Sequence, residues 1–470
     1  MTATAAFEAW AAQHHIDAPH IAIKQTQHAG TGLFAKQAIV THTEPLLRIP
    51  NDMLITTKNA THLHLTEEFR NTIYQLFDGT DEMHLEGKNE RLFLKLFLVH
   101  ERFVHANDSF WKPYMDVLPS LAFFQENHVL FKNYAEHLAG TTLSVSISAK
   151  QRALQNELAT LQEKACGWLD QITLEQWFWA DATFWSRVVS LDEENEAVDN
   201  GQATHLALVP FFDFANHSLT PNVRWQRDSQ DNSFLLMPFE DATIGAHDEL
   251  FISYGAKSNQ ELLFLHGFTL SNNPEPLRLR LPVTPFLAGP SQPAISRFLQ
   301  QNAMEPFVAF GYSHDSAPSS SSQVLPDFPI AHQLFASTGF TYPSIVLMYL
   351  LALDEDDGLR IDEQENIVLG NKQVDAMDGV AEYTSQLEHF KVIQLRVILL
   401  LLDALTYHHG ELSQSIPETT HPSALTNHIA AYRLEEKHSF ECAIDALALL
   451  REELLQEPVV IQYMSSQEQQ

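Results

Sequence analysis

Cysteine and basic residues are both scarce in this chain of 470 residues. Cys166 and Cys442 are its two cysteines, far apart in sequence, so a disulfide framework or a cysteine-rich zinc cluster is not expected. There are 28 basic residues against 60 acidic ones, which gives a net charge of -32. Because phosphate binding needs clustered Lys and Arg, this balance argues against nucleic acid as the main partner. A negative surface instead favours basic protein segments.

The chain also lacks a long uninterrupted apolar run. Its strongest, VIQLRVILLLLDAL (392–405), contains Arg396 and Asp403 and predicts a buried helix rather than a membrane span. The first residues, MTATAAFEAWAAQHHID, include acidic side chains and resemble neither a signal peptide nor a basic transit peptide. We therefore expect no membrane association, a cytoplasmic or nuclear location, and a monomer.

Hydrophobic periodicity predicts an α+β protein. The segments with strand character are 21–26, 45–50, 203–210, 222–226, 233–239 and 249–254. Helical patterns fill the interval from about 65 to 190 and return after Pro274, and Thr173 and Ser258 are placed to begin helices. The predicted organisation is a helical extension (1–19), a β-containing domain with a helical insertion at about 51–200 (20–270), and a helical domain with a mobile insertion at about 311–331 (274–470).

The stretch FFDFANHSLTPNVRW (211–225) places polar residues among aromatic ones. Buried polar groups such as Asp213, Asn216 and His217 are unfavourable unless they are hydrogen-bonded or functional. Taken alone, the phenylalanines are more typical of a core than of a site. Asp213 and His217 have the i, i+4 spacing of metal ligands, but no third ligand or H-E-x-x-H context accompanies them, so no metal is expected.

Four short motifs occur together and in a fixed order. They are HAGTGL (28–33), WSRVVSL (185–191), FFDFANHS (211–218) and ISYGAKSNQELLFLHGF (252–268). This set resembles the SET-domain protein methyltransferases, in particular the subfamily of the Rubisco large-subunit lysine methyltransferase and the actin-histidine methyltransferase. SFWKPYMDVLPS (109–120) is similar to the helical insertion of that subfamily, and YRLEEKHSF (432–440) to its C-terminal substrate-binding domain. The fold implied is a SET-domain β-fold with a pseudoknot, split by a helical insertion and followed by an all-α C-terminal domain.

The resemblance implies S-adenosylmethionine as cofactor and a protein as substrate. In the family, the positions of Asn216 and His217 lie under the cofactor, that of Arg187 faces its carboxylate, and that of Tyr254 is catalytic. The implied cofactor-binding residues are Gly30, Thr31, Gly32, Leu33, Arg187, Asp213, Asn216, His217 and Tyr254. The implied substrate-binding residues are Arg187, Val189, Phe212 and Trp225.

Two positions bear on which nitrogen accepts the methyl group. The histidine-methylating relative has an asparagine where this chain has Val189, and a tryptophan where it has Phe212. Valine cannot hydrogen-bond an imidazole, and a missing partner in a buried site discriminates strongly, so we favour lysine as the acceptor. Histidine methylation, and a non-catalytic SET-fold module that only binds a partner, are the alternatives.

Overall fold

The computed structural model describes the chain with the exception of residues 1, 27–29, 41–42, 81, 83–84, 86–87, 132–133, 192–204, 284–291, 312–338, 365, 415–422 and 468–470. The chain forms two compact units. The first comprises Met1–Tyr134, Ile147–Lys257 and Phe264–Gly267. The second comprises Ala135–Ser146, Ser258–Leu263 and Phe268–Gln470. The domain boundaries derived from the sequence stay a prediction, and the predicted insertion at 311–331 lies outside the described residues except for Gly311.

The first unit begins with helix α1 (Ala3–Gln13), which Thr2 caps by accepting a hydrogen bond from the Ala5 N–H at 3.2 Å. Phe7 of α1 is fully buried, and its ring centroid lies 5.8 Å from that of Phe211 and 5.8 Å from that of Phe214. The N-terminal helix therefore packs directly against the aromatic side chains of the 211–218 segment.

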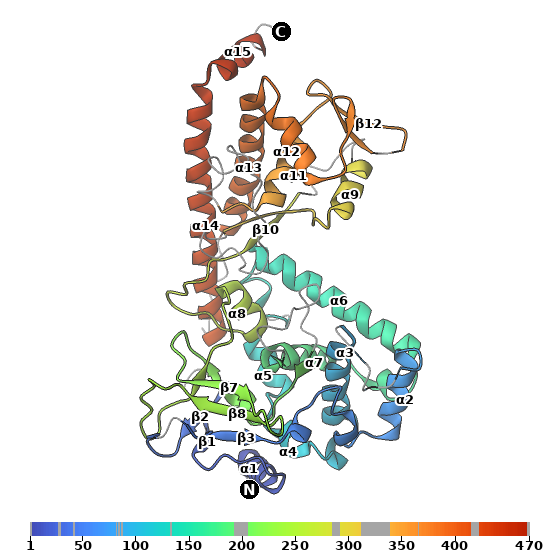
Figure 1. Cartoon of the computed structure of the whole chain (residues 1–470), viewed down its shortest axis with the longest axis vertical. Helices are drawn as coiled ribbons and strands as arrows, with labels where there is room; N and C mark the ends of the chain where they lie inside the picture. Colours follow the sequence, from blue (N-terminus) through green and yellow to red (C-terminus); the bar gives the residue numbers. More distant parts are fainter. Residues whose placement is uncertain are drawn as a thin grey trace. The chain divides into compact units, whose positions relative to one another are not determined.

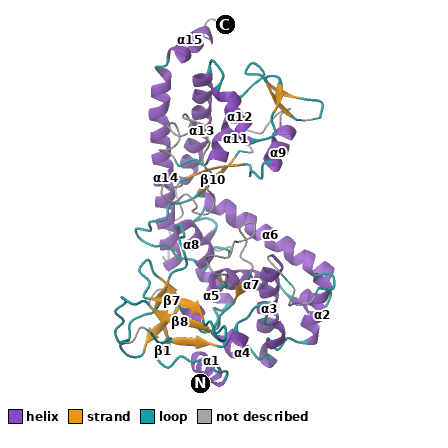
Figure 2. Cartoon of the chain, viewed as in Figure 1, coloured by secondary structure: helices purple, strands orange, loops and turns teal. Residues whose placement is uncertain are grey.

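The strands of the first unit form small sheets (Figure 2). β1 (Ile21–Gln25) pairs with β2 (Thr31–Ala35), and β8 (Phe234–Pro238) lies between β3 (Leu47–Ile49) and β7 (Val223–Arg227), all antiparallel. β4 (Val189–Ser190) pairs with β5 (Leu206–Ala207), and β6 (Asn216–His217) pairs in parallel with β9 (Phe251–Ile252). The strand segments predicted on both sides of the helical interval are thus confirmed, although β4, β5, β6 and β9 have two residues each.

Between β3 and β4 the chain is mainly helical. The helices are α2 (Glu67–Leu76), α3 (Lys88–Val99), α4 (Lys112–Val117), α5 (Leu121–Asn127), α6 (Thr142–Lys164) and α7 (Leu174–Arg187). Thr173 begins α7 as predicted: Thr173 and Gln176 form a capping box. The apolar residues that follow, including Trp177 and Trp179, are fully buried, and burial of this face places Arg187 at the end of the helix.

The second unit contains more β-structure than the sequence predicted. Its helices are α8 (Asn259–His266), whose last residues belong to the first unit, α9 (Gln292–Gln301), α11 (Tyr342–Ala352), α12 (Met377–Ser385), α13 (Phe390–Leu412), α14 (Ala424–Leu455) and α15 (Pro458–Gln467). β10 (Leu279–Pro282) pairs with β11 (Phe307–Phe310), and β12 (Leu359–Ile361), β13 (Ile367–Leu369) and β14 (Lys372–Gln373) form a second small sheet. The expectation of an all-α C-terminal domain is therefore wrong. In β10 the buried Leu279 and Leu281 alternate with exposed Arg280, which is the period of a strand rather than a helix.

Helix α13 contains the strongest apolar run of the chain. Its residues Val392, Val397 and Leu401 are buried, which confirms the prediction of a buried helix for 392–405. Figure 1 shows α13 and α14 side by side, so α14 covers part of this apolar surface. None of the helices in the described ranges combines the length and the apolar character that crossing a bilayer requires.

Candidate functional site

The polar residues of the 211–218 segment follow an unusual turn. Phe211 has a φ of +82°, a left-handed conformation that bulky side chains rarely adopt, and a short 3₁₀ turn over Phe212–Phe214 comes next. The chain then enters β6, whose Asn216 and His217 lie opposite Phe251 and Ile252 of β9. Backbone strain of this kind is typical of functional sites. The parallel pairing brings the ISYG motif next to the NHS motif.

Tyr254 and His217 are in direct contact. Nδ1 of His217 accepts a hydrogen bond from the Tyr254 N–H at 3.0 Å, and the two rings stack with centroids 5.1 Å apart. The Tyr254 hydroxyl donates to the Ala215 carbonyl at 3.0 Å. Burial raises the pKa of Tyr254 to about 12, so the phenol is protonated at neutral pH. Burial also lowers the pKa of His217, which keeps the imidazole neutral.

Asn216 is held by a carboxylate that the sequence analysis did not single out. Its amide Nδ2 donates to Glu249 at 2.7 Å and lies 3.4 Å from the carbonyl oxygen of Thr31. Gly32 lies against this pair, because a Cβ at residue 32 would lie 2.9 Å from Nδ2 of Asn216 and closer still to Glu249. A larger residue at position 32 would therefore displace the ends of these side chains.

The other residues of the GTGL motif have different surroundings. Gly30 has a φ of +73°, a left-handed conformation that favours glycine, and a Cβ built there would lie 4.0 Å from the Phe123 ring, an ordinary van der Waals contact. Leu33 is fully buried in the core, and its carbonyl oxygen accepts a hydrogen bond from the Leu250 N–H at 2.8 Å. Thr31 is partly buried, and its hydroxyl accepts a hydrogen bond from Gln25 at 3.1 Å.

Arg187 and Asp213 form a buried ion pair. NH1 of Arg187 lies 3.2 Å from Oδ2 of Asp213 and donates to the Asp213 carbonyl oxygen at 2.7 Å. The Tyr114 hydroxyl, from α4, donates to the same carboxylate at 2.7 Å. Burial raises the pKa of Asp213, and the neighbouring Arg187 cation opposes this effect. Within the described structure, Nε of Arg187 and Oδ1 of Asp213 are buried without a hydrogen-bond partner.

The predicted substrate-binding residues Phe212, Trp225 and Val189 do not share a single set of contacts. Phe212 is 2% exposed, and its ring centroid lies 4.7 Å from that of Phe234. Trp225 stacks on the same Phe234 at 5.1 Å, and Val189 lies partly buried in β4 opposite Ala207. Phe212 and Trp225 thus share a neighbour on β8, whereas the contacts of Val189 are on a separate pair of strands.

Three residues at the site were missed by the sequence analysis. Glu249 contacts Asn216, Tyr114 contacts Asp213, and the His266 ring stacks on Tyr254 with centroids 4.7 Å apart. Tyr114 and His266 stand inside quoted motifs, WKPYM and LHGF, so their positions were visible although their contacts were not. Glu249 carried one signal only, a charged residue directly before an apolar strand.

Asp213 and His217, the pair considered as metal ligands, each make contacts with other parts of the protein. Asp213 is bound by Arg187 and Tyr114, and Nδ1 of His217 accepts from the Tyr254 backbone.

The elements and contacts above coincide with a known type of domain. Residues 30–255 match the family model of the SET domain, and the chain therefore contains a SET domain. Relatives include SET domain-containing protein 8 of Schizosaccharomyces pombe, 27% identical over 266 residues, which are 55% of this chain and 55% of the relative. Protein-lysine N-methyltransferase EFM1 of Saccharomyces cerevisiae is 25% identical over 308 residues, 57% of this chain and 50% of the relative.

The human actin-histidine N-methyltransferase is 23% identical over 270 residues, which cover 56% of this chain and 42% of that protein. The chain thus spans about half the length of the curated relatives that it matches. Among solved structures, Rubisco LSMT bound to AdoMet aligns with a TM-score of 0.66 and 17% identity over 97% of this chain and 93% of that one. This similarity confirms the predicted SET-domain fold with its C-terminal helical region, and the two small sheets of the second unit are the departure from the predicted all-α domain.

Proposed function

We propose that this protein transfers a methyl group from S-adenosylmethionine to a nitrogen of a protein side chain. The observation that carries the proposal is the contact between the ISYG and NHS motifs, with Tyr254 bonded to His217 and stacked on it. The SET-domain match over 30–255 supports it, as do relatives whose names state protein-lysine and actin-histidine methylation.

The residues present fit the cofactor. Gly30 has no side chain, so a ligand can approach its backbone closely, and the unpartnered Nε of Arg187 and Oδ1 of Asp213 offer a donor and an acceptor. Gly30, Thr31, Gly32, Leu33, Asn216 and His217 would hold it through backbone and side-chain contacts. When bound, S-adenosylmethionine supplies an electrophilic methyl group on a sulfonium, so no metal or covalent nucleophile is needed for the transfer.

Tyr254 is proposed as the catalytic residue. Because its hydroxyl hydrogen is donated to Ala215, the lone pairs of the phenol oxygen remain available as acceptors. They would orient the attacking nitrogen and accept weak C–H···O contacts from the methyl group. The protein's main contribution is alignment, which is worth roughly 7–11 kcal/mol in well-oriented reactions.

We infer that lysine is the acceptor. The side chain of Val189 has no hydrogen-bonding group, which disfavours imidazole as the substrate. Phe212 also favours lysine, because the histidine-methylating relative has a tryptophan at this position. A substrate lysine has a pKa near 10.4 in water and must lose its proton, which an apolar channel beside a bound cation favours. Phe212, Trp225 and Arg187 are proposed to line this channel. Mass-spectrometric mapping of the methylated residue decides: methyl-lysine supports this assignment, and methyl-histidine replaces it with the histidine alternative.

The substrate is proposed to be a protein with a basic segment near the target residue, because the chain carries a net charge of -32. We assign catalysis to residues 20–270 and substrate docking to residues 274–470. The monomeric state and the cytoplasmic or nuclear location stay predictions. Light scattering of the purified chain and imaging of a tagged chain would measure them.

The direct test is transfer of a labelled methyl group to a protein extract. Two or three lost C–H···O contacts of about 0.5–1 kcal/mol each correspond to a roughly 5–150-fold slower rate for Tyr254→Phe. Asn216→Ala should abolish labelling, and Tyr74→Phe, at an exposed position, is the control. If the wild-type protein labels the extract no more than the variants do, yet binds S-adenosylmethionine in calorimetry, catalysis is unsupported. Absence of cofactor binding would favour the non-catalytic binding module.

A further inference from the structure

Two histidines and a glutamate come together in the first unit, at positions outside the candidate site. His100, Glu101 and His105 each offer one ligand atom, and these atoms all lie within 4.8 Å of one another. Nδ1 of His100 is 2.8 Å from Oε1 of Glu101, and Nδ1 of His105 is 3.3 Å from Oε2 of Glu101. The carboxylate thus stands between two imidazole nitrogens.

The local backbone explains why these residues face one another. Directly after α3 the chain forms a π-helical turn over His100–Val104, and the His105 N–H donates to the His100 carbonyl oxygen at 2.8 Å. Residues five apart point to different sides of an α-helix, whereas a π-turn brings them to one side. Such turns inside helices are frequent at functional sites.

The cluster is buried and its carboxylate lacks a permanent cationic partner. The side chains of His100 and Glu101 are 1% exposed, and that of His105 is 22% exposed. In the ranges that the structure describes, Glu101 forms ion pairs with these two histidines and with no lysine or arginine. A buried carboxylate requires a compensating positive charge. A proton on a histidine or a bound cation would supply that charge.

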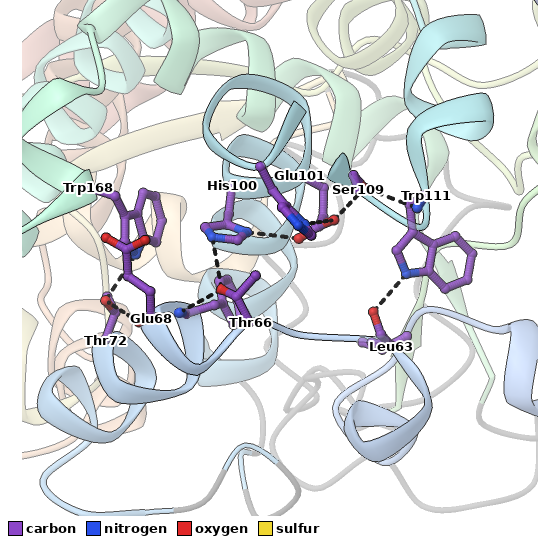
Figure 3. Close-up of polar contacts among 11 residues, drawn as sticks. Leu63, Thr66, Glu68, Thr72, His100, Glu101, Ser109, Trp111 and Trp168 are labelled. Carbon is purple, nitrogen blue, oxygen red and sulfur yellow. Dashed lines mark hydrogen bonds and ion pairs between the residues drawn. The ribbon is translucent and has the colours of Figure 1, made fainter. Parts of the chain in front are cut away.

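The surroundings of the cluster are those of a metal site. Nε2 of His100 lies 3.3 Å from the Thr66 hydroxyl oxygen, and the Ser109 hydroxyl donates to Glu101 at 2.5 Å (Figure 3). Metal-ligating histidines direct their second ring nitrogen to an oxygen in this way, and ligating carboxylates are themselves hydrogen-bonded. With Nδ1 of His100 on a metal, its ring proton would sit on Nε2 and donate to Thr66.

We propose that His100, Glu101 and His105 bind one Zn²⁺ ion. Two imidazole nitrogens and a carboxylate oxygen are a ligand set that zinc accepts, with metal–ligand distances of about 2.0–2.2 Å. Ligand atoms around such a tetrahedral ion lie roughly 3.3–3.6 Å apart, so small side-chain movements suffice. Water or the Ser109 hydroxyl takes the fourth position. This assignment departs from the sequence analysis, which expected no metal.

The ion has a structural role. Ser109, which contacts Glu101, also accepts a hydrogen bond from the Trp111 N–H at 3.0 Å, directly before α4 begins. Tyr114 of α4 then reaches the carboxylate of Asp213. Zinc would fix the segment that joins α3 to α4, and its binding is measurable whether or not the chain transfers methyl groups.

The test is zinc titration of the full-length chain after removal of metals with a chelator. Calorimetry and elemental analysis should show about one Zn²⁺ per chain, and zinc should raise the Tm. His105→Ala removes the most exposed ligand, and Glu101→Gln removes the charge while keeping the size. Each should weaken zinc binding by roughly 100-fold or more and cancel the Tm increase, while circular dichroism confirms that each variant is folded.

Cys442→Ser is the control, because the thiol of Cys442 lies 3.6 Å from Nε2 of His438 and offers a second pair of zinc ligands. It should leave zinc binding unchanged. The proposal is overturned if wild type binds no zinc, if both cluster variants bind zinc like wild type, or if Cys442→Ser alone removes it. Equal Tm losses of Glu101→Gln with and without zinc would likewise identify a hydrogen-bonded cluster without an ion.

Discussion

Gly32→Ala is the sharpest test of the candidate site, because it changes one methyl group at the point where β2 meets β6. The φ of Gly32 is not in the left-handed region, so alanine can adopt the backbone conformation. Its Cβ, however, would lie 2.9 Å from Nδ2 of Asn216, 2.9 Å from Cγ2 of Thr26 and closer still to the Glu249 carboxylate. Real Cβ atoms do not approach so closely, so these side-chain ends must shift, and we expect the shift to weaken the Asn216–Glu249 hydrogen bond.

A hydrogen bond to a charged group contributes about 1.5–3 kcal/mol. We expect the free energy of unfolding of the first unit to fall by about this amount in Gly32→Ala. Each kcal/mol lost should lower the Tm by roughly 2–4 °C. Since Asn216 is proposed to hold the cofactor, its affinity for S-adenosylmethionine should fall at least about tenfold, which equals 1.4 kcal/mol. Denaturant unfolding and calorimetry measure the two effects separately.

The matched control is Gly410→Ala in α13, where nothing lies within 4 Å of the added Cβ. Alanine is the better helix former, so this variant should be more stable by about 0.5–1 kcal/mol and bind the cofactor normally. Wild-type stability and cofactor affinity in Gly32→Ala would refute the reasoning, since the Asn216–Glu249 contact would then have no role in holding the site.

Two further substitutions probe neighbouring contacts. Tyr114→Phe removes one of the donors to the buried Asp213 carboxylate and should cost about 1.5–3 kcal/mol of stability in denaturant unfolding; an unchanged midpoint would contradict the contact. The pKa of His266 is lowered to about 3, mainly by burial, whereas that of an unfolded histidine is about 6.5. As the pH decreases, the unfolded state therefore binds the proton first. The contribution of neutral His266 to the free energy of unfolding is complete above about pH 6.5. It falls as the pH decreases toward 3, by about 2 kcal/mol at pH 5. His266→Phe keeps a ring against Tyr254 and should reduce this loss; an equal loss in both proteins would show that other groups cause it.

Secondary structure could be predicted from the amino-acid sequence wherever one local signal was strong. Thr173 begins α7 because capping depends on residues three positions apart, and 392–405 forms a mostly buried helix because apolar residues occupy most of its surface, with Leu399 and Asp403 exposed. The four motifs also predicted the SET-domain fold, because four segments in the same order identify a family more reliably than any single residue does. Short strands such as β10, with four residues, were missed because the alternation is too brief to outweigh the helical pattern around it.

The contacts between side chains of distant segments could not be predicted from the sequence. Glu249 reaches Asn216, and Tyr114 reaches Asp213, across long separations in sequence that no periodicity encodes. The facing of His100 and His105 depends on a π-turn, whose i, i+5 geometry has no sequence signature of its own. Local patterns fix local backbone conformation, whereas contacts between distant segments follow from how the whole chain packs, and the chemistry of the site lies in those contacts.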